Sequence, residues 1–341
     1  MNVNINMKVL ITGCGGYIGT LLTPYLLRKG YGVRCVDRLF FGDDVIKHVI
    51  GERNFELVKA DTRSISKDVL NGIDAVVDLA ALSNDPAGEL NPQWTLDINY
   101  RARARLAKLA SEVGGVSRYV LASSCSVYGR QSGIADENTE PNPLTTYAKA
   151  NLLAEKDVLP PLASNRFTVT ALRFATVYGP SIRMRFDLVI NAMTLSAFTE
   201  GGVIYVEGDG MQERPLVHVM DVVRAINTVL EAPSDRVNGM VFNVGSDEQN
   251  FRVIDMARIV QGIVGGEVRF RGGMVDARSY RVSFKRIREV LNFSVLYNVD
   301  DGVKQVYHEL LTGHLRPEDR WFTVRWYKKL LEQNPKLLDS Y

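Results

Sequence analysis

The stretch that decides the fold reads Thr12-Gly13-Cys14-Gly15-Gly16-Tyr17-Ile18-Gly19. It follows a short apolar run and opens a helical pattern at residues 17–29. Glycines at these three spacings permit a tight exit from a strand, a close approach of the backbone to a pyrophosphate, and close packing of helix on strand. Asp37 ends the next apolar run, 18 positions after Gly19. The combination predicts a dinucleotide-binding unit rather than an isolated glycine-rich turn.

Strand and helix patterns alternate on both sides of this unit. The predicted strands cover residues 8–12, 33–37, 55–61, 75–80, 118–122 and 167–173. The predicted helices cover residues 17–29, 95–113 and 146–159, the last stopped by two prolines. This alternation predicts an α/β fold with a Rossmann-type, doubly wound parallel sheet.

The regular alternation loosens after residue 180. Helix patterns at residues 188–199, 219–230 and 252–264 are interspersed with short strands at residues 203–206, 241–244 and 268–270. We therefore expect an NAD-binding domain at residues 1–180 and a smaller α/β substrate domain at residues 181–341, with some exchange of strands and helices. The aromatic and basic tail from residue 316 is expected to form a terminal helix packed on the body.

Composition narrows the class of protein. The formal net charge is +2, from 41 basic and 39 acidic residues, so the charge balance does not indicate binding to nucleic acid or to a membrane surface. No apolar run approaches the roughly 18 residues of a membrane span. The three cysteines, Cys14, Cys35 and Cys125, are far apart and lack metal-ligand spacing. We therefore expect no metal site, unpaired cysteines in a reducing compartment, and a cytoplasmic protein.

The residues after the strands suggest how the cofactor is bound. Asp37 would accept hydrogen bonds from the adenosine ribose and repel a 2′-phosphate, which favours NAD, while Arg38 keeps NADP open. Asp61 suits either the adenine edge or a turn cap, and Asn99 either bridges backbone and site or is exposed. The predicted cofactor contacts are Gly13, Gly16, Tyr17, Ile18, Gly19, Asp37, Asp61, Thr62, Leu79, Ala80, Ala81, Asn99 and Tyr147.

Six stretches together resemble the extended short-chain dehydrogenase/reductases, in particular the NAD-dependent sugar-nucleotide epimerase/dehydratase group. They are residues 12–19, Leu-Ala-Ala at 79–81, Ser-Ser-Cys-Ser-Val-Tyr-Gly at 123–129, Tyr-Ala-Lys-Ala-Asn at 147–151, Leu-Arg-Phe-Ala-Thr-Val-Tyr-Gly-Pro at 172–180 and Arg-Pro-Leu-Val-His-Val-Met-Asp at 214–221. The resemblance implies that Ser124 polarises a sugar hydroxyl. It also implies that Tyr147 exchanges the hydroxyl proton while a hydride passes to or from NAD.

One position departs from the family pattern. The residue four places after the tyrosine is a lysine in that family and is Asn151 here. Lys149 cannot replace it, because residues two apart lie on different sides of a helix. Three explanations stay open: an engineered change, a natural variant with altered catalysis, or a binding protein that kept the fold. On sequence alone, Asn151→Lys is expected to raise turnover.

The resemblance also narrows the reaction. Dehydratases of the family carry an Asp-Glu pair where this chain has Cys125 and Ser126, so 4-epimerisation or 4-oxidation and reduction ranks above 4,6-dehydration. Cys125 also resembles the cysteine of 3,5-epimerase/reductases, but its position favours a packing role.

The substrate implied by the resemblance is a nucleotide sugar. Its diphosphate would meet Arg214, with Arg278 as a second clamp and Arg281 as competitor. The remaining predicted substrate contacts are Ser124, Thr176 and Asn191. The family also implies a homodimer built from the helices at residues 95–113 and 146–159.

Overall fold

A seven-stranded parallel sheet forms the centre of the molecule in the computed structural model, which describes residues 7–199, 201–272 and 276–339. The strand order is β11-β7-β5-β4-β1-β2-β3, and every neighbouring pair is parallel. The strands are β1 (Lys8–Thr12), β2 (Gly32–Asp37), β3 (Phe55–Lys59), β4 (Ala75–Asp78), β5 (Arg118–Ser124), β7 (Thr168–Phe174) and β11 (Met240–Val244). The predicted doubly wound sheet is confirmed.

Helices cover both faces of this sheet. One face carries α1 (Gly19–Arg28) and α7 (Val219–Glu231), whose Leu22, Leu26 and Ile226 are buried in one apolar cluster. The other face carries α4 (Ala102–Glu112) and α5 (Thr146–Leu162), which bury Leu106 and Val158 in a second cluster. Burial of such side chains stabilises each layer by about 1.5–3 kcal/mol per residue.

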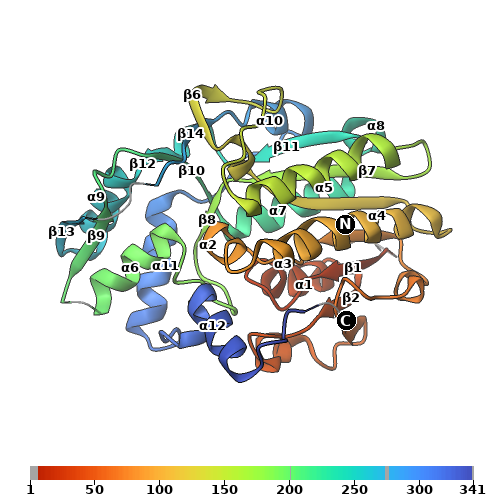
Figure 1. Cartoon of the computed structure of the whole chain (residues 1–341), viewed down its shortest axis with the longest axis horizontal. Coiled ribbons are helices and arrows are strands. Elements are labelled where there is room, and N and C mark those ends of the chain that lie inside the picture. The colour runs from red at the N-terminus through yellow and green to blue at the C-terminus, as the bar shows by residue number, and fades with distance from the viewer. Residues whose placement is uncertain (1–6, 200, 273–275, 340–341) are drawn as a thin grey trace.

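The later part of the chain builds a second region at one end of the molecule (Figure 1). Its helices are α6 (Val189–Thr199), α9 (Val253–Val264) and α11 (Val299–Leu311). Its small sheets pair β9 (Val203–Glu207) with β13 (Glu267–Arg271), and β10 (Glu213–His218) with β8 (Thr176–Tyr178) and β12 (Asn250–Arg252). A further pair joins β6 (Arg130–Ala135) to β14 (Ser279–Val282). The chain crosses back between the regions, because β11 belongs to the central sheet and α7 packs on it.

The remaining elements are short or terminal. The short helices are α2 (Asp85–Gly88), α3 (Pro92–Leu96), α8 (Ser234–Val237) and α10 (Lys285–Leu291). A π-helical turn, η3 (Asp97–Arg101), joins α3 to α4, so the helix expected at residues 95–113 is interrupted in its first part. No helix within the described ranges is long and apolar enough to cross a bilayer.

Two prolines do not stop α5 where the sequence pattern placed its end. The helix continues through Pro160 and Pro161 to Leu162, so the predicted end at residue 159 is wrong. Proline removes the hydrogen bonds to the carbonyls four residues earlier. Those carbonyls belong to Lys156 and Asp157, which are exposed, so water can satisfy them.

The tail packs beside the end of β2. Its helix α12 (Thr323–Gln333) buries Tyr327, and Leu338 beyond it is also buried. The indole of Trp326 donates to the carbonyl of Phe40 at 2.6 Å, and the Arg38 guanidinium donates to the carbonyl of Leu337 at 2.9 Å. The tail therefore forms part of the wall around the carboxyl ends of the strands.

Candidate active site

A cavity of about 1020 Å³ opens at the carboxyl edge of the central sheet. Its wall is drawn from the glycine-rich loop, the ends of β2, β4 and β5, the loop before α6, and the tail. Ligands bind at this edge in doubly wound sheets, where the strand order reverses. The cavity is large enough for a dinucleotide and a second ligand side by side.

The backbone of the glycine-rich loop is shaped so that a ligand can approach it closely. Gly13 has φ +72°, and a Cβ there would lie 2.9 Å from the amide nitrogen of Ala80. A Cβ on Gly19 would lie 2.4 Å from the carbonyl oxygen of Gly13. Gly16 lines the cavity in front of the N-terminus of α1. The loop therefore fits a pyrophosphate, which would meet backbone amides and the positive end of the helix dipole.

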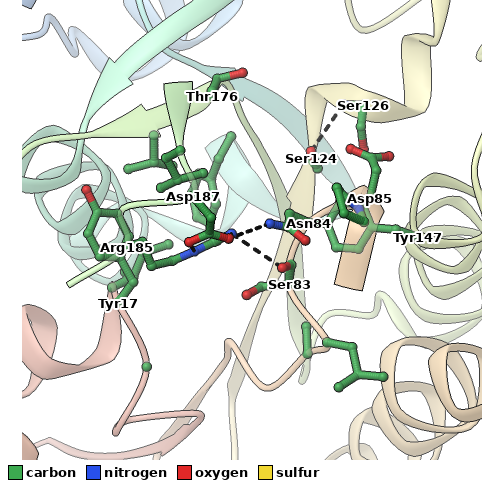
Figure 2. Close-up of a pocket in the computed structure, with 18 of the residues that line it drawn as sticks. Tyr17, Ser83, Asn84, Asp85, Ser124, Ser126, Tyr147, Thr176, Arg185 and Asp187 are labelled. Carbon is green, nitrogen blue, oxygen red and sulfur yellow. Dashed lines mark hydrogen bonds and ion pairs between the residues drawn. The ribbon is translucent and has the colours of Figure 1, made fainter. Parts of the chain in front are cut away.

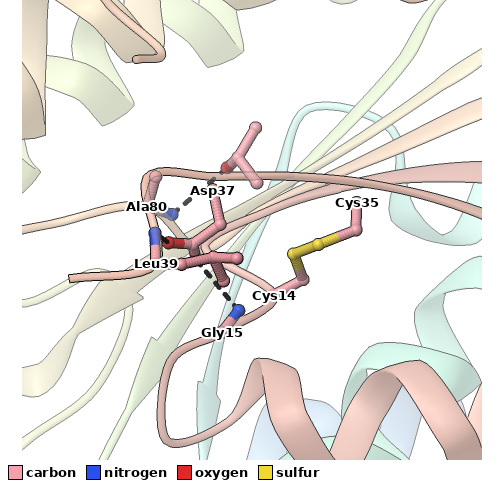
Figure 3. Close-up of a disulfide and its surroundings, with 7 residues drawn as sticks. Cys14, Gly15, Cys35, Asp37, Leu39 and Ala80 are labelled. Carbon is pink, nitrogen blue, oxygen red and sulfur yellow. Dashed lines mark hydrogen bonds between the residues drawn. A yellow bond between two sulfur atoms is a disulfide. The ribbon is translucent and has the colours of Figure 1, made fainter. Parts of the chain in front are cut away.

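A disulfide joins this loop to β2 (Figure 3). Cys14 and Cys35 have Cα atoms 5.7 Å apart, while Cys125 is a free, buried thiol. The expectation of three unpaired cysteines is wrong, because neighbouring strands bring together two residues that are 21 positions apart. The cysteine argument for a reducing compartment therefore no longer holds, and location in the cytoplasm stays a prediction.

Asp37 lies at the end of β2 and lines the cavity, as its predicted role requires. Its carboxylate accepts hydrogen bonds from the backbone amides of Gly15 at 2.9 Å and Leu39 at 2.7 Å (Figure 3). Burial raises the pKa of this carboxyl group, and the backbone amides oppose that rise. The two hydrogen bonds hold the carboxylate in place at the cavity wall.

Asp61 caps a turn and also lines the cavity, so contact with the adenine edge stays a prediction. It lines the cavity beside Thr62, and it also accepts from the backbone amide of Arg63 at 2.9 Å, as a turn cap does. Ion pairs with Arg38 at 3.0 Å and Arg63 at 2.8 Å hold the carboxylate in place. These arginines lower its pKa against the effect of burial. Because Arg38 is engaged with Asp61, it does not stand ready to receive a 2′-phosphate.

Two predicted contacts lie behind the cavity wall rather than in it. Asn99 is fully buried, and its amide exchanges hydrogen bonds with the backbone of Leu82 at 2.8 and 3.0 Å. Asn191 accepts from the amide of Gly179 and donates to the Tyr17 hydroxyl, also while fully buried. The direct cofactor contact expected of Asn99 and the direct substrate contact expected of Asn191 are not what the structure shows. Both side chains hold the loops that do line the cavity.

Ser124 and Tyr147 meet across the cavity floor, from the end of β5 and the first turn of α5 (Figure 2). The Ser124 hydroxyl accepts from the amide of Ser126 at 3.1 Å, and the Thr145 hydroxyl caps α5 through the amide of Ala148. These caps fix the strand end and the helix start that carry the pair. The fold therefore brings together the Ser124 hydroxyl and the Tyr147 phenol. These are the two groups needed to exchange a proton with a sugar hydroxyl.

The pKa of the Tyr147 phenol is raised by burial and by the negative charge of Asp85. The positive charge of Arg103 and hydrogen bonds with Ser124 and Asn151 lower it in part. The phenol is therefore protonated at neutral pH in this state. Its ability to act as a base depends on the charges around it.

Asn151 is buried one turn after Tyr147, in the position where the resemblance expects a lysine. Its amide nitrogen donates to the backbone carbonyl of Tyr147 at 3.1 Å, and its amide oxygen accepts from the Arg103 guanidinium at 3.0 Å. Sequence reasoning did not identify Arg103. Its signal was present, because Arg103 shares the spacing of Leu106, Ala107 and Ala110 on the buried face of α4.

The substrate end of the cavity holds charges that are already paired. Arg214 forms an ion pair with Asp276 at 2.7 Å and donates to the backbone carbonyl of Arg278. Arg278 in turn contacts Asp276 and Asp85. The structure therefore brings the two predicted clamp arginines together around one carboxylate, and both line the cavity, as does Thr176.

Opposite Tyr147 lies a second pair that the sequence analysis missed. Arg185 and Asp187 are 2.7 Å apart, and the Asp187 carboxylate also accepts from the side-chain amide of Asn84 at 2.7 Å (Figure 2). Their signal in the sequence is a charged residue at every second position of residues 183–187. The pair adds a cation and an anion to the wall facing the reacting groups.

Comparisons with known proteins agree with this geometry. The family model "NAD dependent epimerase/dehydratase family" matches residues 9–245. The chain is 26% identical over 311 residues to UDP-glucuronic acid decarboxylase 1 of Xenopus tropicalis, covering 88% of this chain and 71% of that protein. It is 29% identical over 274 residues to the uncharacterized UDP-glucose epimerase YtcB of Bacillus subtilis, covering 76% and 83%.

Solved structures show the same relationship. MoeE5 in complex with UDP-glucuronic acid and NAD superposes with a TM-score of 0.78 at 29% identity, covering 90% of this chain and 99% of MoeE5. UDP-glucuronic acid 4-epimerase from Bacillus cereus shares the fold, with a TM-score of 0.80 at 23% identity and coverage of 90% and 99%. The predicted family resemblance and the predicted use of NAD are confirmed. From residues 9 to 245, the glycine-rich loop and the cavity around it included, the chain belongs to the NAD dependent epimerase/dehydratase family.

Proposed function

We propose that the protein is a nucleotide-sugar 4-epimerase or 4-oxidoreductase that uses Tyr147 as acid/base and Ser124 to polarise the sugar hydroxyl. The observation that carries the proposal is the meeting of Ser124 and Tyr147 at the floor of a cavity whose far wall is a pyrophosphate-binding loop. Relatives named as UDP-sugar epimerases and decarboxylases support the same substrate class.

Different residues along the cavity would bind the cofactor, bind the substrate diphosphate and exchange the proton. The glycine-rich loop and Asp37 would hold NAD, which supplies a reversible hydride acceptor when it is bound. Arg214 and Arg278 would hold the substrate diphosphate, for which a guanidinium is suited by its paired donors. Ser124 would donate a hydrogen bond to the sugar hydroxyl oxygen, and the Tyr147 phenolate would take up that hydroxyl's proton as the carbonyl forms.

The residues after Ser124 argue against a 4,6-dehydratase as the alternative. Cys125 is buried, its thiol donates to the carbonyl of Arg173, and burial raises its pKa. Ser126 is buried as well. Neither side chain is an ionisable acid/base suited to the elimination of water, which needs a proton donor and a base near their operating pKa values.

The direct test is a screen of UDP-, GDP-, dTDP- and CDP-sugars with the NAD-loaded protein. We expect at least one UDP-sugar to be converted, with product stereochemistry inverted at C4 or with NADH absorbance appearing. UDP-glucuronate is assayed for release of carbon dioxide as well. If nucleotide sugars bind but none is converted, the protein is a binding protein and the proposed function is wrong.

We also propose a homodimer formed through residues 95–113 and 146–159, which lie in the helical segment from α3 to α4 and in α5. Leu153 on α5 is 37% exposed, and pairing would cover it. Sedimentation at micromolar concentration should give the mass of two chains. A single-chain mass would remove the proposal without affecting the assigned reaction.

A further inference from the structure

The buried guanidinium of Arg103 lies where the chain lacks an expected lysine. Arg103 is 2% exposed and lines the cavity. Its Nη1 atom donates to the Asn151 amide oxygen at 3.0 Å, and its Nη2 atom donates to the carbonyls of Asp78 and Ala122. These bonds hold the guanidinium near the ends of β4 and β5 and against Asn151, which lies one turn of α5 after Tyr147.

Arg103 forms a buried ion pair with Asp78, at a longer distance than the Arg185–Asp187 and Arg214–Asp276 pairs. Its closest carboxylate, Asp78, lies 3.4 Å from Nε. That carboxylate accepts shorter hydrogen bonds from the hydroxyls of Tyr119 at 2.6 Å and Thr12 at 2.5 Å. Since a buried charge acts over several ångströms in a low dielectric, the guanidinium remains an effective cation on the side that faces Asn151.

The other charged groups around Tyr147 are committed elsewhere. Asp85 on α2 faces the phenol and is paired with Arg278. Across the cavity, Arg185 is paired with Asp187. Lys149 on α5 is exposed.

We propose that Arg103, held against Asn151, supplies the fixed positive charge beside Tyr147 that a lysine at position 151 would otherwise supply. The proposal deepens the proposed function, on which it rests. Arg103 is a positioning residue, because its described contacts reach Tyr147 through Asn151. An asparagine suits position 151 for this reason: its amide oxygen accepts from the guanidinium, whereas a lysine would place a second buried cation against it.

This arrangement reverses the expectation that Asn151→Lys raises turnover. In the parent chain the new ammonium would face Arg103, so turnover and thermal stability should both fall. In an Arg103→Met background the same lysine has room and no competing charge, and should recover turnover by about tenfold or more. The sign of the effect of one substitution therefore depends on the other residue.

The experiment compares the parent, Arg103→Met, Arg103→Lys, Asn151→Lys and the Arg103→Met/Asn151→Lys double variant, each with a Tyr147→Phe counterpart. Arg103→Met should lower turnover about ten- to a hundredfold at neutral pH and move the rising limb of the rate profile up by about 1–2 pH units. Arg103→Lys, which keeps the charge, should restore part of both. Arg118→Met is the matched control, because Arg118 is also buried and donates to the carbonyls of Val229 and Ala232 far from the cavity.

A second readout needs no sugar. The ultraviolet absorbance of tyrosinate, taken as the difference between each chain and its Tyr147→Phe counterpart, gives the ionisation of Tyr147 directly. It should move to higher pH in Arg103→Met and return in Arg103→Lys and in the double variant. If the parent converts no sugar but the Tyr147 titration still moves to higher pH in Arg103→Met, the proposed function is contradicted and the role of Arg103 is supported. An unchanged Tyr147 titration in folded Arg103→Met, or an equal gain from Asn151→Lys in both backgrounds, would overturn that role.

Discussion

Replacing Tyr147 with phenylalanine is expected to lower turnover by a factor of about 10²–10⁴, the usual contribution of a positioned acid/base. The ring would still fill its place beside Ser124, so NAD and the nucleotide sugar should bind nearly as before. The measurement is steady-state turnover of the sugar identified by the screen, with bound NAD quantified in the same preparation.

Tyr100→Phe provides the matched control, and Tyr100 lies on the π-helical turn η3. The Tyr100 hydroxyl donates to Asp157 at 2.6 Å on the outer side of the helices, away from the cavity. Its loss should leave turnover within about twofold of the parent chain, because Tyr100 does not line the cavity. Retention of turnover within tenfold in Tyr147→Phe would mean that another group exchanges the proton.

The second large effect is expected from Glu155→Ala, measured as a loss of about 3–5 kcal/mol in the free energy of unfolding. Glu155 and Arg173 are both 5% exposed and lie 2.6 Å apart. Removing the carboxylate would leave a buried guanidinium without its counter-charge. Glu155 also accepts from the Ser123 hydroxyl at 2.5 Å, so the strand end that carries Ser124 should loosen.

Denaturant unfolding checks this result against two companions. Glu155→Gln keeps hydrogen-bond capacity and should lose less than Glu155→Ala. Asp255→Ala breaks the exposed pairs with Arg252 and Arg258, and should cost much less than Glu155→Ala. If Glu155→Ala costs no more than Asp255→Ala, the buried pair contributes little to stability.

Local patterns in the sequence were sufficient for the sheet and the cofactor loop. The glycines from 13 to 19 and Asp37 depend on neighbours within one βαβ unit, so their arrangement follows from spacing. Asn99 was expected at the site because asparagine is unusual within a helix, and Asn191 because the family resemblance implied it, but the sequence cannot show which side of a loop an amide faces.

Features that depend on distant contacts were missed. The Cys14–Cys35 bond requires that β1 and β2 be adjacent in register. The role of Arg103 requires that α4 and α5 share one face of the sheet, which brings residues 48 positions apart within hydrogen-bonding distance. From the sequence alone, Asn151 therefore indicated that the positive charge of the family lysine is missing. In the fold, the Arg103 guanidinium lies beside it.

The tail has a consequence for the order in which the protein becomes functional during synthesis. The cavity wall includes Gly13 near one end of the described chain and Leu338 near the other. Trp326 and the carbonyl of Leu337 join that wall to the end of β2. Although domains fold as units while a chain emerges from the ribosome, this cavity cannot close until residue 338 has been released. A nascent chain can thus have formed β1 to β5 and still lack a complete cofactor site.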